Sequence, residues 1–203
     1  MLLSRFSRVL EYSILEVLLI MSLSATISAG STRVSIDPPS LTVGAVGDSF
    51  ISNVSISDVA NLYGYEFKLY YNSTVMNGTQ VIEGSFLESG GSAFFRVVNF
   101  TDHYDSTQGL VSIVCTLIGN VSGISGGGVL ATIKFKSLAL ADSAGLHLAD
   151  VELRDPYLSP IPHENVDGTV TVVPEFTSLV IFLTLIAASL FVVLVRKRPM
   201  HKV

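Results

Sequence analysis

The chain has 203 residues, of which 49% are hydrophobic and only 14% charged, whereas soluble domains carry about 25% charged residues. This length corresponds to one domain with additional segments and excludes a large multidomain enzyme. The formal net charge is −5, but residues 30–173 hold six basic and fourteen acidic side chains, a net charge of −8. Such an acidic body argues against nucleic acid as a partner. The single cysteine, Cys115, has no second cysteine with which to form an internal disulfide.

The N-terminal segment, residues 1–29, has the layout of a secretory signal peptide. Basic residues precede a short apolar run that starts at Val17, and small residues precede Gly30. The alternative is an uncleaved anchor helix, although the run is shorter than the ~20 residues that span a bilayer. Both interpretations predict that the body is exported.

The body, residues 30–173, predicts an all-β domain. Short runs of alternating apolar and polar residues recur between Gly, Asn, Asp and Ser, and no run has a helical period. Nine strands at this spacing are typical of a flattened β-sandwich or jelly roll. The predicted strands are residues 33–36, 50–57, 63–71, 79–83, 94–100, 110–117, 129–138, 146–153 and 168–173.

The third predicted strand, residues 63–71, alternates clearly. Its apolar positions predict a buried face, and the side chains between them predict an exposed face with an acid, a base and an aromatic ring. The exposed residues are Glu66, Lys68 and Tyr70. This mixed face suits a polar partner surface, and an ordinary solvated strand face is the alternative.

The strand at residues 110–117 alternates in the same way and places Cys115 among its apolar positions. This predicts a small buried hydrophobic residue, in preference to a reactive or lipidated thiol.

Asparagines that open Asn-x-Ser/Thr sequons are unusually frequent. Five of the seven asparagines do so, whereas the serine and threonine content predicts about one such site. In an exported chain this excess predicts surface glycans, with compositional drift as the alternative. The five are Asn53, Asn72, Asn77, Asn99 and Asn120.

Two features resemble catalytic or metal sites without meeting their requirements. Residues 123–127 match Gly-x-Ser-x-Gly, but they lead into a predicted strand, whereas a nucleophile elbow leads into a helix. The histidines and carboxylates at 102–105 and 163–167 lack the spacing of known metal loops. We therefore predict a protein that is not an enzyme and holds no metal or cofactor.

The C-terminal stretch, residues 177–195, contains nineteen residues without a charge. As a helix it would measure about 28 Å, the thickness of a hydrocarbon core. The basic tail, residues 196–203, begins with Arg-Lys-Arg, which by the positive-inside rule is cytoplasmic. The sequence thus predicts a single-pass cell-membrane protein with an extracellular body.

The tripeptide Pro174, Glu175 and Phe176 stands directly before this stretch. A Pro-Glu-Phe motif, an apolar helix and a terminal basic cluster together resemble the PEF-CTERM sorting signal of archaeal surface proteins. The resemblance implies processing by an archaeosortase, a membrane transpeptidase-like enzyme. A plain single-span anchor is the alternative.

An ordered set of motifs between residues 36 and 173 resembles the cohesin domain family. They are Val-Gly-x-x-Gly-Asp-Ser-Phe at 43–50, the Tyr-rich stretch at 59–71, Glu-Gly-Ser-Phe-Leu at 83–87, Leu-Ala-Thr-Ile-Lys-Phe at 130–135 and Asp-Gly-Thr-Val-Thr-Val at 167–172. The resemblance implies a nine-stranded jelly roll related to carbohydrate-binding modules. It also implies dockerins, calcium-loaded helical modules, as partners. In the family an Asn-x-Asp pair on the third strand contacts the dockerin; here Gly64 and Glu66 occupy those two positions.

We therefore expect a membrane-anchored, surface-displayed, non-catalytic cohesin-like module that binds a protein partner of dockerin type. One alternative is a carbohydrate-binding module linked to polysaccharide binding or breakdown, which the absence of tryptophan disfavours. The other is a glycosylated structural envelope protein without a specific ligand.

Overall fold

The computed structural model describes residues 30–174 and 178–196. These residues form eleven strands and two helices. The strands are β1 (Arg33–Asp37), β2 (Ser40–Val43), β3 (Ser49–Leu62), β4 (Gly64–Asn72), β5 (Met76–Glu83), β6 (Ala93–Thr101), β7 (Gln108–Leu117), β8 (Ile124–Ser137), β9 (Ala141–Arg154), β10 (Glu164–Val166) and β11 (Gly168–Val172). The helices are α2 (Ser85–Glu88) and α3 (Ser178–Arg196).

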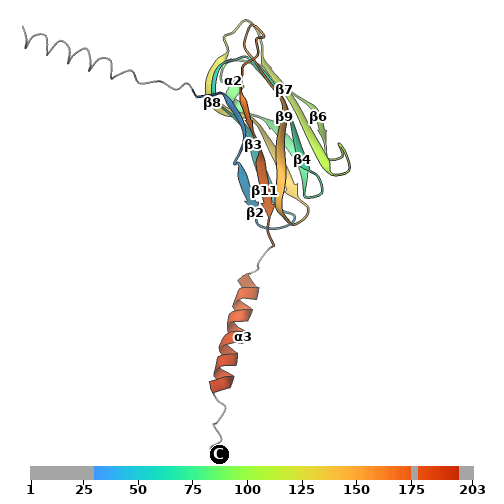
Figure 1. Ribbon diagram of the computed structural model, residues 1–203, viewed down its shortest axis with the longest axis vertical. Helices are drawn as coiled ribbons and strands as arrows, with labels where there is room; N and C mark the ends of the chain where they lie inside the picture. The colour runs from blue at the N-terminus through green and yellow to red at the C-terminus, as the bar shows by residue number, and fades with distance from the viewer. Residues whose placement is uncertain (1–29, 175–177, 197–203) are drawn as a thin grey trace, which may run out of the picture. The chain divides into compact units, whose positions relative to one another are not determined.

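The strands form two sheets that pack face to face (Figure 1). Sheet A has the order β10-β1-β3-β8-β5, and sheet B has the order β2-β11-β9-β4-β7-β6. Neighbouring strands are antiparallel except in the β1–β10 and β2–β11 pairs, which are parallel. The predicted all-β sandwich is confirmed.

The predicted number of nine strands was wrong, because residues 30–174 alone form eleven. The two additional strands, β2 and β10, have four and three residues. Each lies at the edge of a sheet and pairs in parallel with a strand from the other end of the domain. Strands this short are formed by their long-range partners, so their own sequence carries little periodic signal.

Three strands, β3, β8 and β9, begin or end well beyond their predicted limits. Strand β3 continues to Leu62 and pairs with β8 from Ile124 onward, through several register shifts. Asp58 and Asn61 adopt positive φ values of 54° and 59° within this segment. These irregularities interrupt the alternation of apolar residues, so a two-residue period ends before the backbone pairing does.

The core lies between the two sheets and is built from the alternating apolar residues of both. Sheet B contributes Phe67 and Tyr71 from β4, and sheet A contributes Phe135 from β8; all three are at most 2% exposed. The rings of Tyr71 and Phe135 meet edge to face at 5.1 Å across the sandwich. The buried residues of the core all lie between residues 32 and 172, so this segment supplies its own core.

The predicted signal peptide, Glu175 and Phe176 of the sorting tripeptide, and residues 197–203 lie outside the described residues. Pro174 is described and exposed. No helix within the described ranges is both long and apolar enough to cross a membrane. The membrane span predicted over residues 177–195 stays a prediction.

Candidate partner-binding face

Strand β4 lies in the middle of sheet B, between β9 and β7. Its inward side chains are buried, whereas Glu66 is exposed and Lys68 and Tyr70 are partly exposed on the opposite side. The predicted alternation of this strand is thus confirmed, although the role of these three residues stays a prediction. We call the outward side of β9, β4, β7 and β6 the β4 face. Besides the three residues of β4 it includes Arg96, Val98, Asn99, Ser112, Val114, His147, Asp150, Glu152 and Arg154.

Lys68 forms an ion pair across this face, with 2.8 Å between its Nζ and Asp150 Oδ2. A β-bulge positions Asp150, because Glu66 pairs with Glu152 while Lys68 pairs with Ala149, so that β9 carries one extra residue. The hydrogen bond to Asp150 raises the pKa of the Lys68 ammonium group. The two side chains are 40% and 66% exposed, so the pair adds little to stability and is open to a partner.

Glu66 is the acid of this face that the fold leaves unpaired. It stands opposite Glu152, whose carboxylate lies 2.5 Å from Arg154 Nη2. Within residues 30–174 and 178–196, the three salt bridges do not include Glu66. The exposed carboxylate of Glu66 therefore lies beside two ion pairs whose charges already cancel. It can form an ion pair with a cationic side chain of a partner.

The opposite end of β4 carries Tyr70, whose ring meets Tyr104 edge to face at 5.4 Å with an interplanar angle of 64°. On the neighbouring strand His147 stands opposite Tyr70. His147 Nδ1 lies 2.6 Å from Asp167 Oδ2, and the other oxygen of Asp167 accepts the backbone N–H of Leu148. These contacts fix an aromatic and polar cluster at this end of the face.

Three open depressions follow β4 along the face, with volumes of about 190, 440 and 480 Å³. Glu66 lines the first and the second, Lys68 the second, and Tyr70 the third. Each predicted residue therefore borders a hollow of the same face. Open hollows of this kind suit the side chains of a protein surface better than an enclosed small ligand.

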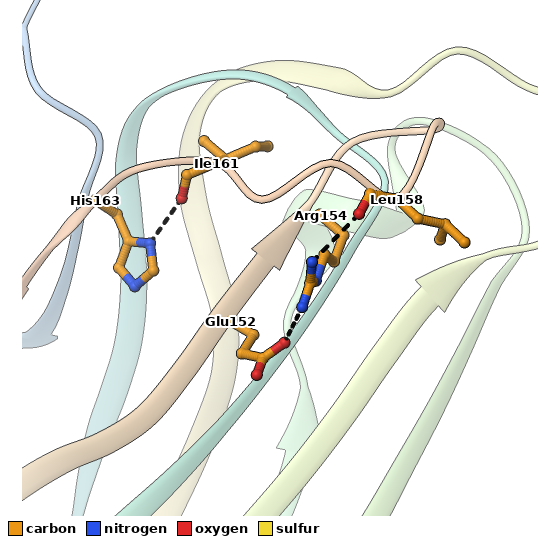
Figure 2. A network of polar contacts seen from close by, with 5 residues as sticks. All are labelled: Glu152, Arg154, Leu158, Ile161 and His163. Atoms are coloured by element: carbon orange, nitrogen blue, oxygen red, sulfur yellow. Dashed lines mark hydrogen bonds and ion pairs between the residues drawn. The ribbon is translucent and has the colours of Figure 1, made fainter.

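The loop after β9 is held by polar contacts (Figure 2), and its Leu158 lines the first depression. Arg154 donates from Nη1 to the carbonyl oxygen of Leu158 at 3.3 Å, while its other nitrogen faces Glu152. Asp155 accepts the backbone N–H groups of Tyr157 and Ser159 at 2.8 Å each. The fixed loop exposes Tyr157 by 85% and Leu158 by 71%, and Leu158 lines the depression.

Two of the loop residues considered as metal ligands, Asp105 and His163, contact the backbone of their own loops. Asp105 accepts N–H groups of Thr107 and Gln108 at 2.7 Å each, and these bonds, that of Thr107 above all, lower its pKa. His163 Nδ1 lies 2.9 Å from the carbonyl oxygen of Ile161 (Figure 2). In the part of the chain that the structure describes, no three His, Cys, Asp or Glu side chains come together to hold a metal ion.

The Gly-x-Ser-x-Gly segment lies at the beginning of β8, as a strand and without a following helix. Ser125 Oγ accepts the backbone N–H of Asn61 at 2.9 Å, so the hydroxyl joins β3 to β8. A nucleophile elbow requires a strand, a sharp turn and a helix in succession. Here the segment is instead part of a strand, and its serine contacts the neighbouring strand.

Three of the five sequon asparagines use their side chains within the fold. The Oδ1 atom of Asn53 accepts from a threonine hydroxyl of β8 at 2.7 Å. Asn72 Oδ1 accepts from the hydroxyl of Thr74 at 2.6 Å, and the Asn77 carboxamide faces the Asp102 carboxylate. The other two, Asn99 and Asn120, are exposed.

Sequence reasoning identified the residues of β4 but missed those of β9. Asp150, Glu152 and Arg154 lie in or just beyond the predicted strand 146–153, and a two-residue period would have placed Glu152 and Arg154 on one face. The bulge at Asp150 has no signature in the local sequence, because it depends on the register with β4.

The family model of the cohesin domain matches residues 33–172, from the first residue of β1 to the last of β11. No curated protein sequence matches significantly. Among solved structures, the chain is similar to a non-cellulosomal cohesin from the archaeon Archaeoglobus fulgidus, with a TM-score of 0.56 and 21% identity over 72% of this chain and 94% of that one.

Two further solved structures show the same fold. The seventh ScaB type I cohesin from Pseudobacteroides cellulosolvens has a TM-score of 0.60 and 20% identity, over 73% of this chain and 96% of that one. The sixth cohesin of Acetivibrio cellulolyticus scaffoldin B, solved in complex with a Cel5 dockerin, has a TM-score of 0.56 and 19% identity, over 71% of this chain and 100% of that one. The match of the family model across the whole sandwich shows that the chain belongs to the cohesin domain family.

Proposed function

We propose that this chain is a non-catalytic binding module, displayed at the cell surface, that binds a dockerin-like protein through the β4 face. Cohesins of the same fold have been solved in complex with dockerins, in Acetivibrio cellulolyticus and in Clostridium thermocellum. The observation that carries the proposal is the exposed Glu66 carboxylate, unpaired beside the Lys68–Asp150 and Arg154–Glu152 pairs.

The chemistry of the face indicates the chemistry of its partner. A lysine or arginine of the partner would pair with Glu66, and apolar side chains would cover Val98 and Leu158, which line the neighbouring depressions. Charges that are already paired, such as Lys68, would orient the partner and add little affinity.

The lack of a side chain at Gly64 supports the central place that our proposal gives to Glu66. A Cβ atom at position 64 would lie 3.2 Å from the backbone oxygen of Cys115 and 3.3 Å from Thr116 Oγ1. A larger residue there would require these neighbours to move. The position at which the resemblance places an asparagine is thus tightly packed and carries no side chain here, and the recognition that we propose uses the acid two residues later.

The aromatic residues of the face support a protein partner over a polysaccharide. A sugar-binding platform needs coplanar exposed rings, whereas Tyr70 and Tyr104 are inclined at 64°. Because the two rings are inclined to each other, they leave little flat surface on which a pyranose ring could stack.

The test measures the affinity of the fragment 30–173 for dockerin modules encoded in the same genome, with calcium present. We expect saturable binding to at least one dockerin. Glu66→Gln keeps the size of the side chain and removes its charge, and should weaken binding by about tenfold, equivalent to about 1.4 kcal/mol. Lys136→Ala, on the exposed side of sheet A, is the matched control and should leave the affinity unchanged.

Two results would contradict this proposal. If no dockerin binds, the partner class is wrong. If a dockerin binds and Lys136→Ala weakens it more than Glu66→Gln does, the binding face is on sheet A.

The proposal includes a membrane tether. Residues 1–29 would direct export, 177–195 would span the membrane and 196–203 would remain cytoplasmic. The tripeptide at 174–176 would mark a cleavage site for an archaeosortase. Mass spectrometry of the mature C-terminus in the membrane fraction tests this step: loss of residues 177–203 supports sorting, and an intact tail leaves a plain anchor.

A further inference from the structure

The sequon at Asn99 lies on β6, the edge strand of sheet B. The register with β7 shifts between Val97 and Asn99, and Asn99 stands opposite Ser112. Val98 lines the same depression as Ser112, so this bulge turns two consecutive side chains, Val98 and Asn99, toward the β4 face. Bulges commonly re-aim a side chain at a functional surface.

Asn99 lies in one row with the centre of the face. It pairs with Ser112, and Ser112 pairs with Lys68. Two strand spacings separate Asn99 from Lys68, which amounts to about 10 Å. A group attached to Asn99 therefore lies next to Val98, which lines the same depression as Lys68 and Glu66.

The Asn99 carboxamide is also accessible to solvent. The side chain is exposed, and none of the side-chain hydrogen bonds found within the described ranges involves it. Asn53, Asn72 and Asn77 differ, because their carboxamides contact other groups of the fold.

We propose that Asn99 is an N-glycan acceptor and that its glycan closes the β4 face to partners. Asn99 Nδ2 forms a bond with C1 of a saccharide carried on a polyisoprenoid phosphate or diphosphate. The C1–O bond of that donor breaks, the phosphate leaves with the electron pair, and one amide proton passes to a base of the membrane transferase.

The consequence for binding follows from size. A glycan is bulky and well hydrated, and a chain of a few sugars reaches across the two strand spacings to Lys68. In glycosylated molecules the glycan would then block a partner from the β4 face, whereas in unmodified molecules the face would be accessible. This inference rests on the proposed function in treating the β4 face as the partner face and in requiring that the body be exported.

The first measurement is site-resolved glycopeptide mass spectrometry of the full-length protein, purified from the membrane of its source organism. We expect glycan masses on Asn99 and on Asn120, which is exposed in the loop after β7 and reports that the chain met the transferase. An unmodified Asn99 overturns the proposal, whether or not Asn120 is modified.

The second measurement asks whether the glycan covers the face, and needs no partner. An amine-acetylating reagent is applied to the native protein, and labelling of Lys68 is compared with that of Lys136, which is exposed on sheet A. We expect Asn99→Gln to increase the Lys68 to Lys136 labelling ratio several-fold. Asn120→Gln, which removes a glycan elsewhere, should leave the ratio unchanged.

Each outcome of this comparison decides the proposal. An equal ratio in the native protein and in Asn99→Gln overturns it, even if Asn99 is glycosylated. Asn99→Asp provides a second unglycosylated variant, in case the glutamine variant folds poorly. Failure of dockerin binding would refute the proposed function but would not alter either result, because neither measurement contains a dockerin.

Discussion

The phenol of Tyr71 donates a hydrogen bond to the Asp102 carboxylate, with 2.5 Å between the two oxygens. The same carboxylate oxygen accepts the backbone N–H of Gly78 at 2.8 Å. Tyr71 belongs to sheet B and Gly78 to β5, the edge strand of sheet A. A single carboxylate thus ties the two sheets together at one open side of the sandwich.

This relationship predicts a loss of stability at alkaline pH. Burial, followed by the contact with Asp102, raises the pKa of Tyr71 above that of an unfolded tyrosine, about 10. The stabilisation of the neutral phenol is fully present below pH of about 10 and is lost progressively above it, because the unfolded chain releases the proton first. Urea unfolding between pH 8 and 11 measures the effect.

The matched variants for this prediction are Tyr71→Phe and Tyr157→Phe. Tyr71→Phe should reduce the decrease in unfolding free energy above pH of about 10. Tyr157 is 85% exposed, and its variant should retain the slope of the parent. Equal slopes for all three proteins would contradict the assignment to Tyr71; Tyr65, buried and with a raised pKa, would then account for the decrease.

The backbone at Leu158 predicts a stabilising substitution. Leu158 has a φ of +63°, which costs a residue with a Cβ roughly 1 kcal/mol relative to glycine. Its side chain is 71% exposed, so little packing is lost. Leu158→Gly should raise the unfolding free energy by a few tenths to about 1 kcal/mol.

Leu140→Gly is the control for this substitution, because Leu140 is 54% exposed and is not among the residues with positive φ. It should be neutral or destabilising. If both variants destabilise the protein equally in urea titrations, the conformation of Leu158 stores no strain.

We expect substitution of Gly84 by alanine to destabilise the protein severely. Its N–H donates to the carbonyl oxygen of Leu130 at 2.9 Å, and a Cβ at this position would overlap the backbone carbonyl of Val129. Because backbone cannot move aside as a side chain can, Gly84→Ala should cost roughly 3 kcal/mol or more. Gly145→Ala, where a Cβ meets no atom within 4 Å, should unfold at the same urea concentration as the parent.

We expect the thiol of Cys115 to be unreactive in the folded protein. It is 1% exposed, and burial raises its pKa to about 12, so almost no thiolate exists at pH 8. Iodoacetamide should leave the folded protein unmodified over hours and alkylate it rapidly in urea. Rapid alkylation of the folded protein would show that sheet B opens locally around β7.

The sequence predicted the elements whose signal is local. In β4 and β7 the side chains alternate with period two, and this pattern correctly separated the buried Phe67 and Cys115 from the exposed Glu66. It also limited the candidate face to one side of one strand. Strands β2 and β10 escaped prediction because their few residues pair with strands distant in the chain.

By itself the sequence determined an acidic, all-β body and the three outward side chains of β4, because burial on one side of a strand produces a two-residue alternation of apolar and polar residues. The tertiary structure decided which neighbours those side chains have. Asp150 reaches Lys68, and Asn99 turns toward the same face, through bulges in β9 and β6. A bulge is a property of the register between two strands, and register is fixed by contacts between residues far apart in the chain.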